Sequence, residues 1–96
     1  MARNRRYHPL VAEDLSKATD HYDAISVELG NRFRGSVRAC LQDVTARPAS
    51  FGVVDGPVRA ALIEHFPFVV LFEDCGPIVL ILGIHHAASD PTSWRR

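Results

Sequence analysis

The feature that most constrains this fold is a pair of strand-length segments that are apolar on both faces. Residues 68–73 read FVVLFE and residues 78–86 read IVLILGIHH, with the turn sequence DCGP between them. Side chains alternate between the two faces of a strand, so a strand without polar alternation is typical of one covered on both sides. These segments therefore predict the centre of a β-sheet that needs protein packed against each face.

Three strands are expected in this half of the chain, joined as an antiparallel meander. The first covers residues 58–64. If a two-residue loop at 75–76 closes the last hairpin, Glu73 lies opposite Ile78. The two-residue period also predicts which side chains share a face. On the last strand the expected sets are Ile78, Leu80, Leu82 and Ile84 on one face, and Val79 and Ile81 on the other.

The first half of the chain has helical periodicity. Apolar residues recur at spacings of three and four, which is the pattern of an amphipathic α-helix. The first stripe is Val11, Leu15, Ala18, Tyr22, Ile25 and Leu29, and the second is Phe33, Val37, Leu41 and Val44. Pro9 suits the start of the first helix, and Gly30 is expected to end it. Arg47-Pro48 ends the second helix, so the two helices form an antiparallel hairpin.

Together these elements predict a single α+β domain over residues 1–96. A short strand near the N-terminus precedes the helical hairpin, and the three-stranded meander follows it. The expected boundaries are about 9–47 for the hairpin, 48–57 for a loop, 58–86 for the sheet and 87–96 for a C-terminal tail.

One face of this sheet has no predicted cover, because a single helical hairpin can pack against only the other face. Soluble monomers rarely expose a large apolar patch without a use for it. A binding partner is one explanation, and we favour it. The alternative is that the loop before the sheet and the two chain ends fold over that face.

Composition excludes several classes of function. Eleven basic residues balance eleven acidic ones, so no net field attracts the chain to nucleic acid or to a membrane surface. Neither a signal peptide nor a membrane span is expected from the sequence. The two cysteines lack metal-ligand spacing and indicate reduced thiols in a cytoplasmic protein.

The histidines near the C-terminus are the residues closest to a chemical motif. His85 and His86, with His65 and Asp90, are the residue types of a metal site. Adjacent residues of a strand point to opposite faces, however, so they cannot easily share one ion, and no metal is expected. No glycine-rich phosphate-binding loop is present, and no cofactor is expected. His86 alone is either a general base or a hydrogen-bonding cap of its strand, and we favour the cap.

The order of these landmarks resembles a known family. The matching positions are Tyr7-His8-Pro9, the segment AEDLSKATDHYDAISVELGNRF, Arg47-Pro48, Arg59 to Leu62, Phe66-Pro67-Phe68, His86, Asp90-Pro91 and Trp94. In combination they resemble the RelE/ParE superfamily of toxins from bacterial type II toxin–antitoxin systems, also called plasmid stabilisation proteins. The resemblance covers essentially the whole chain and implies a β-αα-βββ fold with the hairpin on one face of a small twisted sheet.

The same resemblance implies partners. A cognate antitoxin wraps such toxins with its C-terminal segment and forms a hetero-oligomer with them, while ParE-like members poison DNA gyrase and RelE-like members cut mRNA on the ribosome. The implied target-binding residues are Arg59, His86, Trp94, Arg95 and Arg96. An acidic antitoxin segment with apolar anchors suits arginine forks and the uncovered face. The candidate antitoxin contacts are Arg32, Arg34, Arg38, Val69 and Leu71.

The departures from the family pattern favour the ParE-like branch, a growth inhibitor that binds its target and is no enzyme. Many members carry an arginine where this chain has Ser89, and residues 58–94 contain one arginine, Arg59, and no lysine. Cleavage of RNA requires positive charge at the scissile phosphate. Two alternatives stay open: an endoribonuclease that uses His86, Arg59, Arg95 and Arg96, or a degenerate toxin that only binds its antitoxin.

Overall fold

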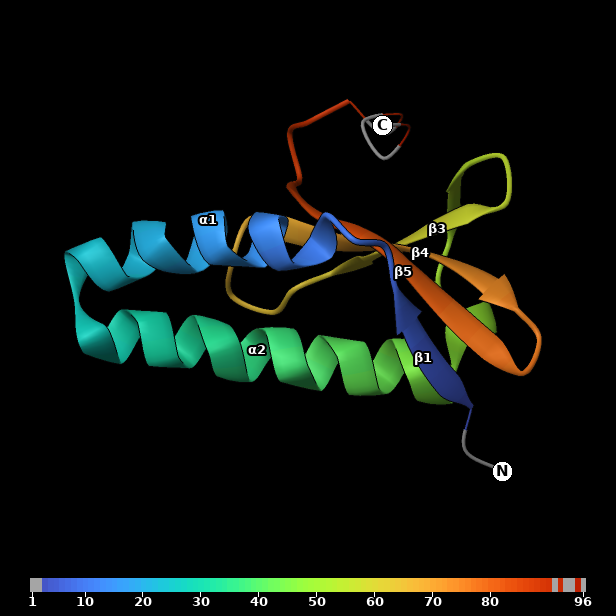
Figure 1. The fold of residues 1–96 in the computed structure, drawn as a ribbon, viewed down its shortest axis with the longest axis horizontal. Helices are drawn as coiled ribbons and strands as arrows, with labels where there is room; N and C mark the ends of the chain where they lie inside the picture. Colours follow the sequence, from blue (N-terminus) through green and yellow to red (C-terminus); the bar gives the residue numbers. More distant parts are fainter. Residues whose placement is uncertain (1–2, 91, 93–94, 96) are drawn as a thin grey trace.

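The computed structural model describes residues 3–90, 92 and 95. A short strand comes first, two helices follow, and four further strands complete the chain (Figure 1). The elements are β1 (Asn4–Tyr7), α1 (Val11–Ile25), α2 (Val27–Ala46), a 3-10 turn η1 (Pro48–Ser50), β2 (Val53–Asp55), β3 (Val58–Leu62), β4 (Phe68–Cys75) and β5 (Ile78–His86). The predicted α+β class and the order strand, helical hairpin, meander are confirmed.

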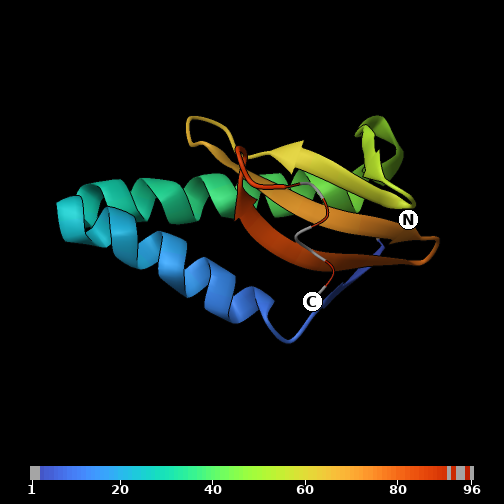
Figure 2. The same cartoon turned by 90° about the horizontal axis from the view of Figure 1, so that it is seen from above.

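The sheet has five strands in the order β1-β5-β4-β3-β2. The meander β3-β4-β5 is antiparallel, and β1 lies parallel to β5, so the sheet is mixed. Figure 2 shows both helices on one side of this sheet. The segment expected to be a plain loop over 48–57 instead contains η1 and β2, since β2 pairs with β3 as an outer strand.

The two helices meet at Ser26 and not at Gly30, so the predicted junction is wrong. The Ser26 hydroxyl accepts a hydrogen bond from the backbone N–H of Leu29 at 3.0 Å, which is N-cap geometry for α2. Gly30 is buried inside α2, where a Cβ atom would overlap the carboxylate of Asp23. The glycine leaves room for the Asp23 carboxylate, and the serine makes the break.

This earlier break changes which apolar residues are buried. Ile25 is the last residue of α1, at the hairpin tip beyond the sheet, and its side chain is 63% exposed instead of buried. The rest of the first stripe packs as predicted, and the second stripe is confirmed. Buried are Val11, Ala18, Tyr22, Phe33, Val37 and Val44, while Leu15, Leu29 and Leu41 are partly buried against them.

The register of the last hairpin also differs from the prediction. Cys75, and not Glu73, lies opposite Ile78, because β4 continues to the tight turn at Gly76-Pro77. Gly76 has φ of 76°, a conformation that glycine adopts without a steric penalty.

A β-bulge at Leu82 interrupts the alternation of β5. Leu71 pairs with Gly83 and Phe72 pairs with Ile81, so Leu82 is the extra residue. Beyond the bulge the phase reverses, and Ile84 packs in the helix-side core instead of sharing a face with Leu82.

A second, smaller apolar cluster lies on the sheet face away from the helices, which we call the open face. Val58, Leu71 and Leu82 are buried there, and Ala60, Val69 and Leu80 are partly buried. The sequence therefore predicted correctly that both faces are apolar. Ala87, Ser89 and Asp90 after β5 line a pocket on this face, and Arg95 reaches Asp55 of β2. Some of the cover thus comes from the chain itself.

Candidate functional site

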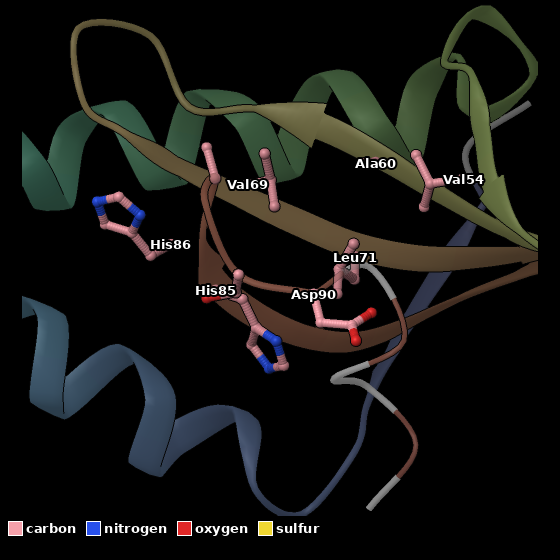
Figure 3. Close-up of a pocket in the computed structure, with 9 residues that line it drawn as sticks. Val54, Ala60, Val69, Leu71, His85, His86 and Asp90 are labelled. Carbon is pink, nitrogen blue, oxygen red and sulfur yellow. The ribbon is translucent and has the colours of Figure 1, made fainter.

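A pocket of about 180 Å³ opens on the open face, at the end of β5 (Figure 3). Its apolar wall consists of Val54 from β2, Ala60 from β3, and Val69 and Leu71 from β4. Its polar end is formed where β5 stops. The residues there are His85, His86, Ala87, Ser89 and Asp90. The apolar wall forms because β4 is apolar on both of its faces. The polar end forms because the chain reverses direction after β5.

His85 is held at this pocket by Asp14 of α1. Its Nε2 lies 3.3 Å from the Asp14 carboxylate, which also accepts the backbone N–H of Ile84 at 3.2 Å. Both side chains are nearly buried, with 12% and 15% of their surface exposed. Sequence reasoning missed this pair, because the partners lie far apart in the chain and only the packing of α1 against β5 brings them together.

His86 points away from His85, as Figure 3 shows. Its Nδ1 accepts the backbone N–H of Ala88 at 3.1 Å, and its ring lies edge-on to Phe68 with 5.4 Å between centroids. This is the hydrogen-bonding role that the cap hypothesis describes. A general base at this position would have to give up that backbone contact.

Asp90 places a negative charge at the rim. The backbone N–H and the hydroxyl of Thr92 donate to one of its carboxylate oxygens at 2.9 and 2.8 Å. These bonds hold the pKa of Asp90 below its ordinary value, so it is ionised at neutral pH. The described residues that line the pocket include no lysine or arginine.

Arg59 is not brought to this pocket. It lies opposite Phe72, whose side chain belongs to the helix-side core, while its neighbour Ala60 faces the pocket. Its Nη1 donates to the carbonyl oxygen of Phe51 at 2.6 Å. The predicted constellation of Arg59 with His86 is not formed, because Arg59 lies opposite Phe72 and His86 lies opposite Phe68, at separate positions along β4.

The C-terminal candidates are described in part. The guanidinium of Arg95 forms two hydrogen bonds with the Asp55 carboxylate, at 3.1 and 2.8 Å, and ties the chain end to β2. Trp94 and Arg96 lie outside the described residues.

The candidate antitoxin contacts fall on opposite sides of the molecule. Arg32, Arg34 and Arg38 are exposed on α2, whereas Val69 and Leu71 lie on the open face. One linear segment can contact both groups only by wrapping around an edge of the sheet. Of the three arginines, Arg34 already forms an ion pair within the chain, with Asp23 at 2.6 Å.

Two further structural facts bear on the site. Across residues 3–90, 92 and 95, no group of three or more histidine, cysteine, aspartate or glutamate side chains is arranged to hold a metal ion. No helix in that part of the chain combines the length and apolarity needed to cross a membrane.

Comparisons with known proteins place the fold. No model of a known protein family matches the chain, and no curated protein matches it. Among solved structures, a chain of the "Chromosomal ParDE TA system from P. aeruginosa" is similar with a TM-score of 0.74 and 19% sequence identity. The similarity covers 88% of this chain and 96% of that one. The protein therefore has the fold of a chain from a ParDE toxin–antitoxin system, as the resemblance in its sequence implied.

Proposed function

We propose that this protein is the toxin of a bacterial type II toxin–antitoxin module, acts in the cytoplasm and is neutralised by a cognate antitoxin. The observation that supports this most directly is the fold shared with a ParDE system over 88% of the chain. Fold alone does not specify function, so the site must agree with the proposal. The open face provides that agreement, since it offers an apolar pocket suited to another protein.

The same pocket favours binding over RNA cleavage. A ribonuclease must neutralise the developing charge on a phosphate, usually with arginine or lysine. Here the described lining includes the carboxylate of Asp90 and no such cation, and Arg59 lies on the other side of the sheet. We therefore propose DNA gyrase as the target. The proposed contacts are His86 and the chain end with Trp94, Arg95 and Arg96, and Arg59 is the least well placed of the set.

Expression of the chain from an inducible promoter in a bacterial host tests this proposal. We expect growth arrest, rescue by the small reading frame beside the gene, and inhibition of supercoiling when the purified protein is added to gyrase. Val69→Glu, which puts a charge into the pocket wall, is expected to abolish the growth arrest and the inhibition of supercoiling. Val27→Glu at the exposed hairpin tip is the matched control and should keep both.

Three outcomes separate the alternatives. Harmless expression with binding to the neighbouring gene product would identify a degenerate toxin. Primer extension that shows cuts in mRNA, lost in His86→Ala, would identify a ribonuclease. Harmless expression without any binding to that product would refute the toxin–antitoxin assignment.

A further inference from the structure

The sheet has two outer strands, and they differ in how much free edge they present. β2 has three residues, and its register with β3 shifts between Val53 and Asp55. Short, irregular strands are poor templates for another strand. β1 is regular over its four residues and lies at the other end of the sheet (Figure 1).

The part of β5 that β1 does not cover is short, and a side chain bonds one of its backbone groups. β1 pairs with β5 only from Ile78 to Ile81. Beyond that point the Ile84 N–H, which would otherwise face an empty edge, is bonded to the carboxylate of Asp14. The free edge on this side of the sheet is therefore that of β1.

The backbone of β1 offers hydrogen-bonding groups on its outer side. The N–H groups of Asn4 and His8 donate to the carbonyl oxygens of Pro77 and Ile81, toward β5. In a parallel ladder the backbone N–H and C=O groups of alternate residues point toward the neighbouring strand. The backbone groups of Arg6 therefore also point toward β5, while those of Arg5 and Tyr7 point outward.

This edge is strongly basic. Arg3, Arg5 and Arg6 lie within four residues, and none of them forms an ion pair with another described residue. Arg3 bonds the carbonyl oxygens of Gly76 and Ala46, and Arg5 bonds the hydroxyl of Thr45. The charges of Arg3 and Arg5 are thus positioned by neutral acceptors, and no described carboxylate pairs with any of the three arginines.

Apolar hollows continue from the end of this strand. Tyr7, Val11 and Leu15 line a hollow of about 460 Å³ beside the turn into α1. Leu15 also lines a second hollow of about 280 Å³, which Arg34 and Arg38 border. Arg38 forms no ion pair with another described residue. A path of basic and apolar groups therefore runs from the β1 edge onto the helical hairpin.

We propose that the outer edge of β1 binds an extended acidic segment of a partner protein, which adds to the sheet as a sixth strand. The outward backbone groups of Arg5 and Tyr7 bond the added strand. Its carboxylates lie on the open face near Arg6, which pairs with Leu80, and its apolar side chains lie on the helix side and enter the hollow at Leu15. If the proposed function holds, this segment belongs to the antitoxin. A second copy of the chain is a poor occupant, because pairing two β1 edges would bring their arginines together.

The test uses the full chain, labelled with ¹⁵N, and a capped peptide in which glutamate alternates with valine. We expect chemical-shift changes and hydrogen-exchange protection at the amides of Arg5 and Tyr7, with binding that weakens as salt is raised. Arg6→Glu is expected to weaken binding about ten-fold or more. Lys17→Glu makes the same charge change on exposed α1 and should alter the affinity by less than about two-fold.

The opposite results are equally definite. Shifts centred on the open face at Val69 and Leu71, equal binding of a peptide with lysine in place of glutamate, or dimerisation through β1 without peptide would each overturn the inference. Rescue assays separate it from the proposed function. If the protein is toxic and the antitoxin still rescues growth with Arg6→Glu at unchanged affinity, the edge assignment fails and the toxin assignment stands. If the peptide protects β1 but expression of the protein does not arrest growth, the edge assignment stands and the toxin assignment fails.

Discussion

Removal of the Phe33 ring should be the most damaging single truncation in the helical hairpin. Phe33 is fully buried where α2 meets the sheet. Its ring lies 4.9, 5.0 and 5.5 Å from those of Tyr22, Phe66 and Phe68, so one side chain joins α1, α2 and the turn into β4. We expect Phe33→Ala to weaken all of these contacts together.

The magnitude follows from two contributions. Burial of a phenylalanine side chain stabilises a fold by about 1.5–3 kcal/mol, and each edge-on aromatic pair adds about 0.5–1.5 kcal/mol. Because neighbours relax partly into the space left behind, we expect a loss of about 3–5 kcal/mol for Phe33→Ala. A domain of this size has roughly 5–15 kcal/mol of stability in total, so the melting temperature should fall by at least about 12 °C.

Urea and thermal unfolding, followed by circular dichroism, measure this loss. Phe33→Leu keeps most of the apolar area and should cost about 1–2 kcal/mol. Val27→Ala, at a side chain that is 73% exposed, is the control and should change stability by less than about 0.5 kcal/mol. A loss below about 1.5 kcal/mol for Phe33→Ala, with an unchanged urea dependence, would refute the view that this ring anchors the hairpin to the sheet.

Three further predictions concern Ser26, Asp14 and the buried thiol of Cys40. Ser26→Ala should cost about 1 kcal/mol in urea unfolding, because the first turn of α2 loses its side-chain acceptor; an unchanged midpoint would argue against the break at this residue. Asp14→Ala should cost about 1–3 kcal/mol, since it leaves the Ile84 N–H and the His85 ring without this acceptor, and Asp14→Asn should cost less. Burial raises the pKa of the Cys40 thiol from 9.0 to about 11. Since the thiol is harder to ionise when folded, its contribution to stability is complete below pH 9 and is lost as the pH rises through about 11. The fall over that window should be shallower in Cys40→Ala, and equal slopes would contradict the assignment.

Much of the fold is already determined by local pattern in the sequence. The 3.6-residue stripes place the two helices, and the apolar runs of β4 and β5 place a sheet with two buried faces. These patterns are reliable because burial acts on whole faces, and a few misassigned residues do not change which face is apolar. The scarcity of lysine and arginine in the sheet half is likewise visible in the sequence, and the described residues that line the pocket on the open face include neither type.

Tertiary structure alone decided the details that depend on one contact. Nothing in the apolar stripe distinguishes Ser26 from Gly30 as the helix break, which the structure places at the Ser26 cap, with Gly30 inside α2. The bulge at Leu82 likewise leaves no local signal, yet it transfers Ile84 to the opposite face.

The candidate site shows most clearly which features follow from the sequence and which depend on tertiary packing. The resemblance grouped Arg59 with His86, but the two lie opposite different residues of β4, and the alternation of side chains along β3 turns Arg59 away from the pocket. Conversely, Asp14 meets His85 only because β1 is too short to cover the end of β5 and the first turn of α1 takes its place. Composition and periodicity determine which faces are buried, whereas contacts between distant residues are set by how the completed helices and strands pack.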